Sequence, residues 1–559
     1  ILDCLSIQGR LSYERDNTNF RREKYASTYR LSMGAYSETM NFYEHLFGDA
    51  LVSFNKTWND FTVAATAGAS FTKEVTHGTY LNAEGDQYYE VDVTDANGIT
   101  YKMPQGNVYF PNIFHRDNYY DIYYQENYTK KRLNSVFGTL QLGYKDMVYL
   151  DLTARNDWSS ALAFTESMSF FYPSVGATFL LDEMFHMNDD LFDMVKLRAS
   201  YSVVGNDIPA YYSRPVATLS KLTITLPTVM PFTDWKPEKT FSIEAGFDLA
   251  MLHNRLRTEF TFYKANTKNQ YFQVSAPVAS GYSKRNINAG NVENLGIEAS
   301  LSYRLDFNHD WSWTPGINFS YNKNEIKELC PGLEEYNLAE ASAFIMKLKK
   351  GGSYGDIYTY DFQYDDNGNI KLDNTGAPLL TSDADTYAGN FNSKFHLGWS
   401  NTINWKNLNI YALVDGKIGG KVLSMTEAIM DGYGVSKATG DARLNGGVPN
   451  KDGSMIDAEK YYSRVGGRAQ NAGFNAMEYM YSATNFRLRE LSVGYTFENL
   501  FGMNKNLTAS VVGRNLFFLY KKSPCDPDIS GSTGNGWQGI DVFSLPATRS
   551  WGLNLKLNF

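Results

Sequence analysis

Hydrophobic and polar residues alternate one by one over many stretches of about ten residues in this chain. The C-terminal stretch shows the pattern most clearly, because one face carries Trp551, Leu553, Leu555, Leu557 and Phe559. The opposite face carries Ser550, Gly552, Asn554, Lys556 and Asn558. The same alternation runs through residues 148–155, 241–249 and 295–307. Stretches of this length and period predict tilted β-strands that cross a bilayer.

The links between these stretches alternate between very short and long. Very short turns are expected at residues 59–60, 145–146, 253–254, 309–310 and 406–407. Long polar links are expected at residues 74–118, 206–236, 267–290, 325–391, 419–484 and 521–547. A transmembrane barrel has short periplasmic turns and long extracellular loops, whereas a soluble β-sandwich has no reason to keep this rhythm. The sequence therefore predicts an all-β fold, a transmembrane antiparallel β-barrel with roughly seventeen strands present here.

The strand count leads us to expect only part of a barrel. If the last strand ends in the periplasm, the first of roughly seventeen strands runs inward from the outside. A closed barrel has an even number of strands, and an open one would leave unpaired backbone in lipid, so at least one upstream strand is expected. About 22 strands would complete a barrel of the class with a plugged lumen. We interpret residues 1–559 as a partial barrel domain without its plug domain and signal peptide.

Composition and charge agree with this interpretation and narrow the function. Aromatic residues make up 15% of the chain, as in barrels with aromatic belts at the membrane interfaces. A mean hydropathy of −0.39 does not distinguish a barrel from a soluble protein, since only alternate residues of a barrel strand face lipid. No apolar run approaches the roughly 18 residues of a membrane-spanning helix. A net charge of −9 disfavours non-specific binding of nucleic acid.

No motif in the chain indicates an enzyme or a metal site. Cys4, Cys330 and Cys525 are far apart, which fits neither a dense disulfide framework nor a zinc site and leaves one long-range bridge open. The string Gly534-x-Gly536-x-x-Gly539 lacks the strand and helix that a phosphate site needs, so an external loop is expected there. No GxSxG or SxxK sequence occurs, and we predict that the protein is not an enzyme.

Two acidic loops raise the question of calcium. Residues 365–369 (DDNGN) resemble a calcium loop, but the glycine is misplaced and a hairpin turn explains the sequence better. Asp526 and Asp528 would supply carboxylate oxygens, yet two carboxylates do not complete a site. We expect no cofactor, with calcium in a loop as the minor alternative.

Aromatic and acidic residues in the links are the candidates for ligand binding. These are Trp158, Tyr211, Tyr212, Tyr433, Trp537, Asp526 and Asp528. Aromatic faces beside amide and carboxylate groups hold sugar rings or peptide side chains, although such residues more often pack loops together or form the interface belt. On the polar strand faces, the residues expected to line the lumen are Arg155, Glu244, Glu298 and Arg304.

Several segments together resemble the SusC/RagA family of TonB-dependent outer-membrane transporters of Bacteroidetes. The clearest are KLRASY at 196–201 with Gly-Asn at 205–206, NAGNVENLGIE at 288–298 and NFRLRELSVGY at 485–495. Others lie at 137–146, 154–160, 171–176, 281–282, 513–517 and 526–528. Their order and spacing cover roughly residues 130–559, while the residues before 130 match only loosely.

The resemblance implies a 22-stranded barrel, an N-terminal plug whose TonB box couples to the energised inner-membrane motor, and a SusD-like surface lipoprotein that closes over the mouth. It also implies that Trp551, Leu555, Leu557 and the terminal Phe559 form the barrel-assembly signal. We thus expect an outer-membrane protein, surrounded by lipid and lipopolysaccharide, that imports oligosaccharides or peptides and binds no nucleic acid. A dimer of transporter–lid pairs is a further expectation.

Glycan is the favoured substrate, on the loop Trp and Tyr residues beside Asp and Asn. One alternative is an outer-membrane barrel without transport activity, acting as an adhesin or as a structural or assembly component. A soluble multi-domain β protein is the other.

Overall fold

The computed structural model describes most of the chain. The described residues are 4–24, 35–84, 90–94, 98, 100–104, 123–188, 190–213, 217–220, 223–230, 232, 234–276, 278–330, 332–341, 343–466, 474–499, 505–529, 531 and 536–558. Of the residues singled out above, Phe559 and Gly534 lie outside this set.

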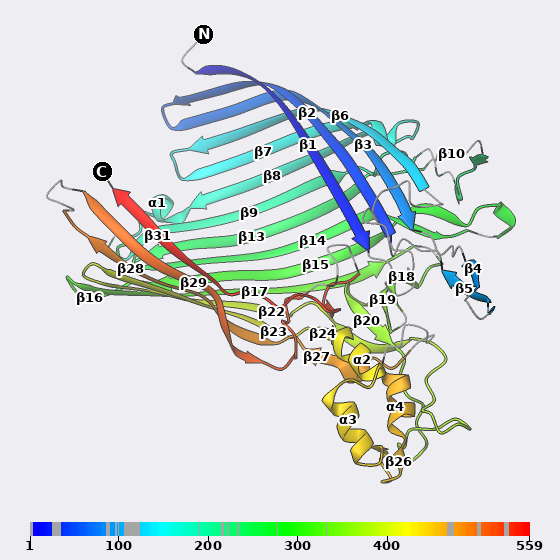
Figure 1. The fold of residues 1–559 in the computed structure, drawn as a ribbon. Helices are drawn as coiled ribbons and strands as arrows, with labels where there is room; N and C mark the ends of the chain where they lie inside the picture. Colours follow the sequence, from blue (N-terminus) through cyan, green and yellow to red (C-terminus); the bar gives the residue numbers. More distant parts are fainter. Residues whose placement is uncertain are drawn as a thin grey trace.

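One large antiparallel sheet dominates the fold (Figure 1). Its long strands, each hydrogen-bonded to the next along the chain, are β1 (Leu5–Lys24), β2 (Ala35–Trp58), β3 (Phe61–Glu84), β6 (Tyr123–Tyr144), β7 (Val148–Ser159), β8 (Ser169–Leu180), β9 (Phe192–Asn206), β13 (Glu238–Met251), β14 (Leu256–Ser275), β15 (Lys284–Tyr303), β17 (Trp311–Glu328), β22 (Phe395–Trp405), β23 (Leu408–Ile418), β28 (Asn485–Phe497), β29 (Asn506–Lys521) and β31 (Ser550–Asn558). The 18-stranded sheet also counts β12 (Val229–Met230), which pairs with β15, and β16 (Leu305–Asn308), which continues β15 past Arg304. The all-β prediction and the approximate size of the sheet are confirmed.

The register of the large sheet shows how alternation gives it one apolar and one polar face. We call this 18-stranded sheet the wall. Across five neighbouring strands, one row of partners is apolar, and all of its members except the half-buried Leu140 are exposed: Leu140, Leu152, Val175, Tyr201 and Ile243. The next row is polar throughout: Thr139, Thr153, Ser174, Ser202 and Ser242. A slip of one residue in any strand would exchange these rows, so the hydrophobic pattern fixes the register.

The five very short turns are confirmed, and left-handed backbone at their polar residues explains how they fit. Asn59 has φ 45°, Lys145 has φ 51° and His253 has φ 60°, a conformation that short polar turns require. α1 (Leu181–Phe185) lies at the same rim, as do the end of β28 at Phe497 and the start of β29 at Asn506. This rim is called the short-turn rim below.

Two expectations about the strands are wrong, namely that the first strand runs inward from the outside and that residues 267–290 form a long link. β1 begins beside Phe54, close to the turn at 59–60, and β31 ends beside Asn506, so both lie on the short-turn rim. β1 therefore starts at the short-turn rim and runs outward. β31 runs back toward the same rim, because an even number of long strands lies between β1 and β31. The link expected at 267–290 is also mostly strand, since β14 and β15 pair up to Ser275 and Lys284. Strands that extend beyond the membrane can be polar on both faces, which removes the period-two signal.

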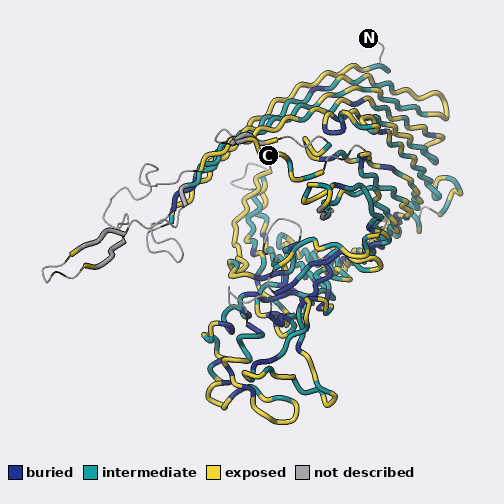
Figure 2. The backbone as a smooth tube through the Cα atoms, turned by 90° about the vertical axis from the view of Figure 1, so that its right-hand side faces the viewer, coloured by how far each residue is buried: buried dark blue, intermediate teal, exposed yellow. Residues whose placement is uncertain are grey.

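The sheet curls round without closing among the described residues. β1 pairs only with β2, and β31 pairs only with β29. Figure 2 shows the wall as an incomplete ring with the two chain ends at its edges. No helix in the described part of the chain has the length and apolar character needed to span a membrane.

Three of the long links fold together into a compact body, which we call the loop cap (residues 335–390, 421–482 and 536–541). Its strands are β18 (Glu335–Glu340), β19 (Phe344–Lys349), β20 (Asp356–Thr359), β21 (Thr386–Asn390), β24 (Lys421–Ser424), β27 (Met480–Ser482) and β30 (Ile540–Asp541). Its helices are α2 (Met425–Gly432), α3 (Lys437–Leu444) and α4 (Ala458–Val465). Figure 1 shows these helices projecting from the end of the wall opposite α1 and β16.

The loop cap has its own hydrophobic core, which the polar composition of the links did not predict. Phe344, Met346, Ile357, Leu423 and Ile540 are completely buried, and they come from all three links. β24 pairs with both β27 and β30, which ties the second link to the third. The helices have eight residues each and are too short to be stable alone, so packing against this core must hold them.

Side-chain caps fix where the helices of the loop cap begin. The hydroxyl of Ser424 accepts from the N–H of Glu427 at the start of α2, and Ser436 does the same for Thr439 in α3. The carboxylate of Asp457 accepts from the N–H of Lys460 in α4. Such N-caps satisfy N–H groups that have no partner inside a helix.

The remaining elements are short. They are β4 (Glu90–Thr94), β5 (Thr100–Pro104), β10 (Thr218–Ser220), β11 (Thr223–Thr225), β25 (Val448–Pro449), β26 (Met455–Ile456) and the 3-10 helices η3 (Ser160–Leu162), η4 (Val278–Ser280) and η5 (Met477–Tyr479).

Candidate functional site

A cavity of about 760 Å³ lies between the inner face of the wall and the loop cap. The wall side is formed by β14, β15, β17, β22 and β23, and the other side by residues 353–356, 387–394 and 527–529. The polar residues of its lining include Tyr263, Asn294, Glu298, Asn322, Asn324, Tyr354, Tyr387, Asn390, Asn392 and Asp528. We call this space the lumenal cavity.

Asparagine amides join the two sides of the lumenal cavity. Asn324 accepts from the backbone N–H of Tyr354 at 2.8 Å, and its own amide donates to Asn294 at 3.0 Å. On the cap side, the amide of Asn392 donates to the carbonyl of Tyr354 at 2.7 Å. An amide has two donor hydrogens and an acceptor oxygen, so each keeps groups for a ligand after making these bonds.

Tyrosines complete the lining of this cavity. The hydroxyl of Tyr263 donates to Asn322 at 3.2 Å from the wall side. On the cap side, burial and the nearby Asp356 carboxylate raise the pKa of Tyr387 to about 12. Tyr387 therefore stays protonated at neutral pH and presents a neutral aromatic face with a hydroxyl donor.

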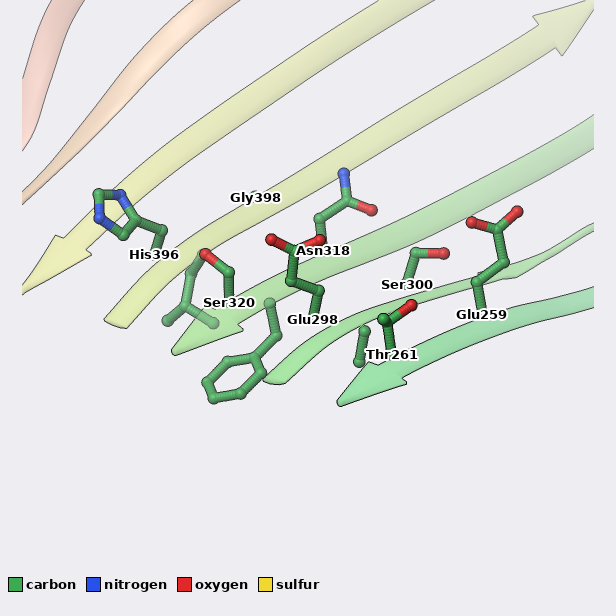
Figure 3. A pocket seen from close by; sticks show the side chains of 11 residues that line it. Glu259, Thr261, Glu298, Ser300, Asn318, Ser320, His396 and Gly398 are labelled. Carbon is green, nitrogen blue, oxygen red and sulfur yellow. The ribbon is translucent and has the colours of Figure 1, made fainter. Parts of the chain in front are cut away.

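A smaller cavity of about 400 Å³ continues along the wall (Figure 3). The two cavities share Glu298, Ser320 and His396. Thr261, Glu298, Ser320 and His396 are direct register partners across β14, β15, β17 and β22, so they form one polar row. Such a row gives a wetted surface that leads away from the lumenal cavity along the wall.

Two carboxylates stand out, Glu298 on this row and Glu259 two residues before Thr261 in β14. Glu259 and Glu298 form no ion pair among the described residues, in contrast to Asp248, which is bound to both Lys196 and Arg198. Figure 3 shows both glutamates on the same side of the strands as Asn318 and His396. The smaller cavity is therefore lined by two carboxylates that form no ion pair within the described part of the chain.

A buried arginine anchors the last link to the wall. Arg487 in β28 is only 4% exposed and binds Asp526 at 2.7 Å and Asp528 at 3.3 Å. Its guanidinium also lies over the ring of Phe518, 4.1 Å from the centroid. Buried ion pairs of this kind cost several kcal/mol when one partner is removed, so the segment 526–529 is held firmly.

Asp528 belongs to a wider network on the cavity side. Lys417 binds its carboxylate at 2.6 Å, and Arg489 binds it at 3.3 Å while also pairing with Asp415. Burial would raise the pKa of Asp528, but the bonds to Lys417 and the charges of the two arginines outweigh it and keep this pKa below its ordinary value. Asp528 is therefore ionised at neutral pH.

The structure brings together only some of the predicted ligand residues. Asp528 and Glu298 line the lumenal cavity, whereas Asp526 is turned toward Arg487. Trp537 packs edge-on against Phe344, with ring centroids 5.4 Å apart, and so contributes to the core of the loop cap. Tyr433 lines a separate hollow at the outer end of the loop cap.

Trp158, Tyr211 and Tyr212 lie elsewhere, near a second small core formed by Leu162, Ile208 and Trp235. Tyr212 contacts the rings of Trp235 and Tyr271 at centroid distances of 6.4 and 5.7 Å. Their role in ligand binding stays a prediction.

The expected lumen residues also differ in their surroundings. Arg155 is bound to Asp157, Tyr172 and Ser135 in a network at the outer end of β7. Glu244 lies on the inner face opposite Ser200 and Tyr263. Arg304 binds Asp306 at 2.9 Å near the short-turn rim, far along the strand from the cavity.

The expected assembly signal is exposed on one face of β31. Trp551, Leu555 and Leu557 pair with Gly513, Ala509 and Leu507 of β29 and remain open on the outside. Phe559 lies outside the described residues.

The question of metals and disulfides has a partial answer. Both Asp365 oxygens accept hydrogen bonds from Asn367 and Asn369, which confirms the hairpin turn at 365–369. In the described part of the chain, no group of three or more His, Cys, Asp and Glu residues is placed to hold a metal ion. No disulfide joins Cys4, Cys330 and Cys525, all of which are described. Calcium stays a prediction.

The asparagines of the cavity were missed in the sequence, although a signal existed. Asn322 and Asn324, and likewise Asn390 and Asn392, are separated by one residue. In extended chain this spacing places both amides on the same face. Repeated Asn-x-Asn at the outer ends of predicted strands would have indicated an amide-lined surface.

Comparison with known proteins now identifies the family. Residues 5–415 match the model of the TonB dependent receptor-like β-barrel. The chain belongs to the TonB-dependent receptor family. This assignment and the nature of its members place the protein in the outer membrane and confirm the predicted location.

Relatives of known name support the predicted subgroup. TonB-dependent receptor P3 of Formosa agariphila is 23% identical over 100% of this chain and 57% of its own length. TonB-dependent receptor SusC of Bacteroides thetaiotaomicron is 23% identical over 77% of this chain and 44% of its own length. The chain thus spans about half the length of these relatives, and the predicted SusC/RagA resemblance is confirmed.

Among solved structures, the RagAB peptide importer in the open-open state superimposes with a TM-score of 0.76 at 19% identity, covering 100% of this chain and 60% of that chain. Another structure, of the RagAB peptide transporter, gives a TM-score of 0.73 at 20% identity, with the same coverage. These likenesses show the fold.

Proposed function

We propose that this chain forms most of the barrel of a SusC-type importer and that the lumenal cavity holds the substrate as it enters the lumen. Oligosaccharides are the favoured substrate. The carrying observation is that amides and phenols from the wall and the loop cap meet around a cavity of about 760 Å³. Its volume is that of a ligand pocket, about 300–1,000 Å³.

The chemistry of the lining favours a neutral ligand rich in hydroxyl groups. Asn294, Asn322 and Asn390 offer donors and acceptors without net charge, and Tyr263 and Tyr387 offer aromatic faces. Two of the three lysines in the lining, Lys323 and Lys417, are engaged in ion pairs with Glu325 and Asp528, and Lys394 is the third. A sugar chain satisfies such a lining through its hydroxyls and its apolar ring faces.

Peptides are the second substrate class, and a specific observation favours them. The RagAB structures, which share this fold, are named as a peptide importer. Asparagine amides can also pair with the backbone N–H and C=O groups of an extended peptide. A direct competition experiment between the two classes decides between them.

The energy for import would come through a plug segment of the full-length protein that contacts TonB. A SusD-like surface lipoprotein would close the mouth above the loop cap, and the polar row from Thr261 to His396 would give the substrate a wet surface. Members of the family are transporters, and we assign no chemical step to this chain.

The test uses the full-length protein in its host, with fluorescent neutral oligosaccharides and fluorescent short peptides as separate probes. Tyr387→Ala should reduce oligosaccharide uptake roughly tenfold, whereas Tyr128→Ala should leave it unchanged. The two tyrosines are matched, being 54% and 57% exposed, but only Tyr387 lines the cavity. Uptake should stop when TonB is deleted.

Each contrary result has a distinct meaning. Surface binding that persists without any TonB-dependent uptake would support the alternative of an adhesin or a structural or assembly barrel. Uptake of peptides alone would agree with an importer and would make peptides, instead of oligosaccharides, its substrate class.

A further inference from the structure

A second hollow, of about 460 Å³, lies at the outer end of the loop cap between α2, α3 and α4. We call it the tip cavity. It shares no lining residue with the lumenal cavity. Figure 1 shows the three helices grouped together away from the wall, so a ligand bound there would be outside the lumen.

Glycines make the scaffold around the tip cavity compact. A Cβ on Gly447 would lie 2.3 Å from the carbonyl oxygen of Ile456, and one on Gly466 would lie 2.2 Å from the nitrogen of Gly432. Only glycine allows these segments to approach so closely. Gly434 and Gly446 have φ of 69° and 82° and form turns after α2 and α3. The cavity is therefore built into the packing of the helices.

Aromatic faces line this hollow. Tyr433 is 57% exposed, and Tyr462 lines the cavity from α4. No hydrogen-bond partner for either hydroxyl occurs among the described residues. An exposed tyrosine ring with a free hydroxyl combines an apolar face and a polar end in one side chain.

Charged groups of both signs complete the tip cavity. One N–H of Arg443 donates to the carbonyl of Gly434 at 3.1 Å, which holds the guanidinium in place and leaves its other donors available. One oxygen of Asp457 accepts from the N–H of Lys460 at 3.1 Å, and its second oxygen is not needed for the cap. The lining thus offers donors, acceptors and ring faces, and its charged groups are the Arg443 guanidinium and the carboxylates of Asp431, Asp457 and Glu459.

We propose that the tip cavity is a saccharide-binding site that holds part of an oligosaccharide before it reaches the lumenal cavity. Pyranose rings present an apolar face for Tyr433 and hydroxyls for Arg443 and Asp457. This inference rests on the proposed function, because it assigns the same class of ligand to a second site on the same chain. Two sites on one polymer raise the local concentration of substrate at the mouth.

Exposed apolar side chains next to the tip cavity define the alternative that this surface binds a protein. Val435 and Leu444 are 68% and 87% exposed and follow the lining residues Gly434 and Arg443 in the chain. If this surface bound a protein, Leu444 would contribute to the interface. If it binds a saccharide, Leu444 should not contribute, since it does not line the cavity.

The experiment is hydrogen–deuterium exchange on the full-length protein in detergent, with short neutral gluco-, manno- and galacto-oligosaccharides as probes. We expect protection at residues 431–434, 443–447 and 457–459, separate from protection at 322–324 and 387–392. Tyr433→Ala and Arg443→Ala should weaken the first protection roughly tenfold in probe concentration and leave the second unchanged. Leu444→Ala and Tyr128→Ala should affect neither.

The outcomes separate this inference from the proposed function. Protection confined to 322–324 and 387–392 overturns the tip site and leaves the importer in place. Loss of binding in Leu444→Ala but not in Tyr433→Ala overturns the saccharide assignment in favour of a protein surface. Protection at the tip alone, with none in the lumenal cavity, supports the tip site and contradicts the proposed role of the lumenal cavity.

Discussion

The wall and the loop cap bury their hydrophobic residues in opposite ways. In the wall, apolar rows such as Leu152, Val175 and Ile243 point outward, where the membrane covers them. In the loop cap, Phe344 and Ile357 point inward and are fully buried. The apolar residues of the wall are removed from water by lipid, whereas those of the loop cap are removed from water only by packing against one another.

The largest expected effect is in the core of the cap. Phe344→Ala should destabilise the loop cap by about 3–5 kcal/mol, because it leaves a cavity in a tightly packed core. Hydrogen exchange of residues 335–390 should rise while the wall keeps its heat-resistant mobility in gels. Phe543→Ala, at an exposed loop residue, is the control and should change little. Melting of the wall together with the cap would show that the two regions are one unit.

The next effect concerns the anchor between the two regions. Arg487→Met should free the segment 526–529 at a cost of about 3 kcal/mol, because it leaves the carboxylates of Asp526 and Asp528 without their buried partner. Hydrogen exchange of this segment measures the loss. Arg514→Met removes an exposed ion pair with Glu490 and should cost less than about 1 kcal/mol. Equal effects would contradict the anchor.

The acidic partner of the same anchor predicts a pH dependence. The folded-state pKa of Asp528 is lowered, so its stabilising contribution is complete above the ordinary value of 3.8 and is lost as the pH falls through the lower folded value. The hydrogen-exchange protection factors of the segment 526–529, corrected for the intrinsic pH dependence of exchange, should therefore stay constant from neutral pH down to about 5 and fall only in strong acid. A transition near neutral pH would contradict the assignment.

In the wall, a charge on the outer face should act differently from one on the inner face. Ile243→Arg should destabilise the barrel in vesicles by about 2–4 kcal/mol, since it places a charge in lipid. Ser242→Arg, one residue away on the inner row, should have little effect. Urea unfolding in vesicles measures both. Similar losses would mean that the two faces are assigned wrongly.

The smallest expected effect concerns charge selection along the polar row. Glu298→Gln and Glu259→Gln should strengthen binding of sulfated oligosaccharides by roughly threefold to tenfold, because each removes a negative charge from the lining of the smaller cavity. Binding of neutral oligosaccharides should stay the same. Glu183→Gln in α1 at the short-turn rim is the matched control. Unchanged sulfate discrimination would show that these glutamates do not face the ligand.

The same contrast explains how much the sequence could predict. Alternation, short turns and the family motifs predicted the wall, because a strand between lipid and water must alternate apolar and polar residues. The predicted direction of β1 was wrong because the count of roughly seventeen strands is odd. An even number of long strands is present among the described residues, and one strand fewer reverses the direction of the first. The core of the loop cap was hidden, since Phe344, Leu423 and Ile540 are isolated apolar residues in three distant polar links. Their contact depends on tertiary packing that no local period records.

The candidate site was harder to predict for the same reason. Glu298 and Asp528 were named in advance and do line the lumenal cavity, but Trp537 packs within the cap core instead. Asn324, Tyr354 and Asn392 meet only because the cap folds back onto the wall. Arg487 looked like an ordinary strand residue, and only the structure shows that it is buried against the last link.

The central claim is that substrate passes through the space between the wall and the loop cap. The most direct measurement is uptake of labelled oligosaccharide by cells carrying the full-length protein with Asn322→Trp, which fills the lumenal cavity from the wall side. Asn17→Trp, on exposed β1, is the control. With equal amounts of heat-resistant barrel at the surface, the account predicts that Asn322→Trp abolishes uptake and Asn17→Trp does not. Undiminished uptake with the cavity filled would contradict it.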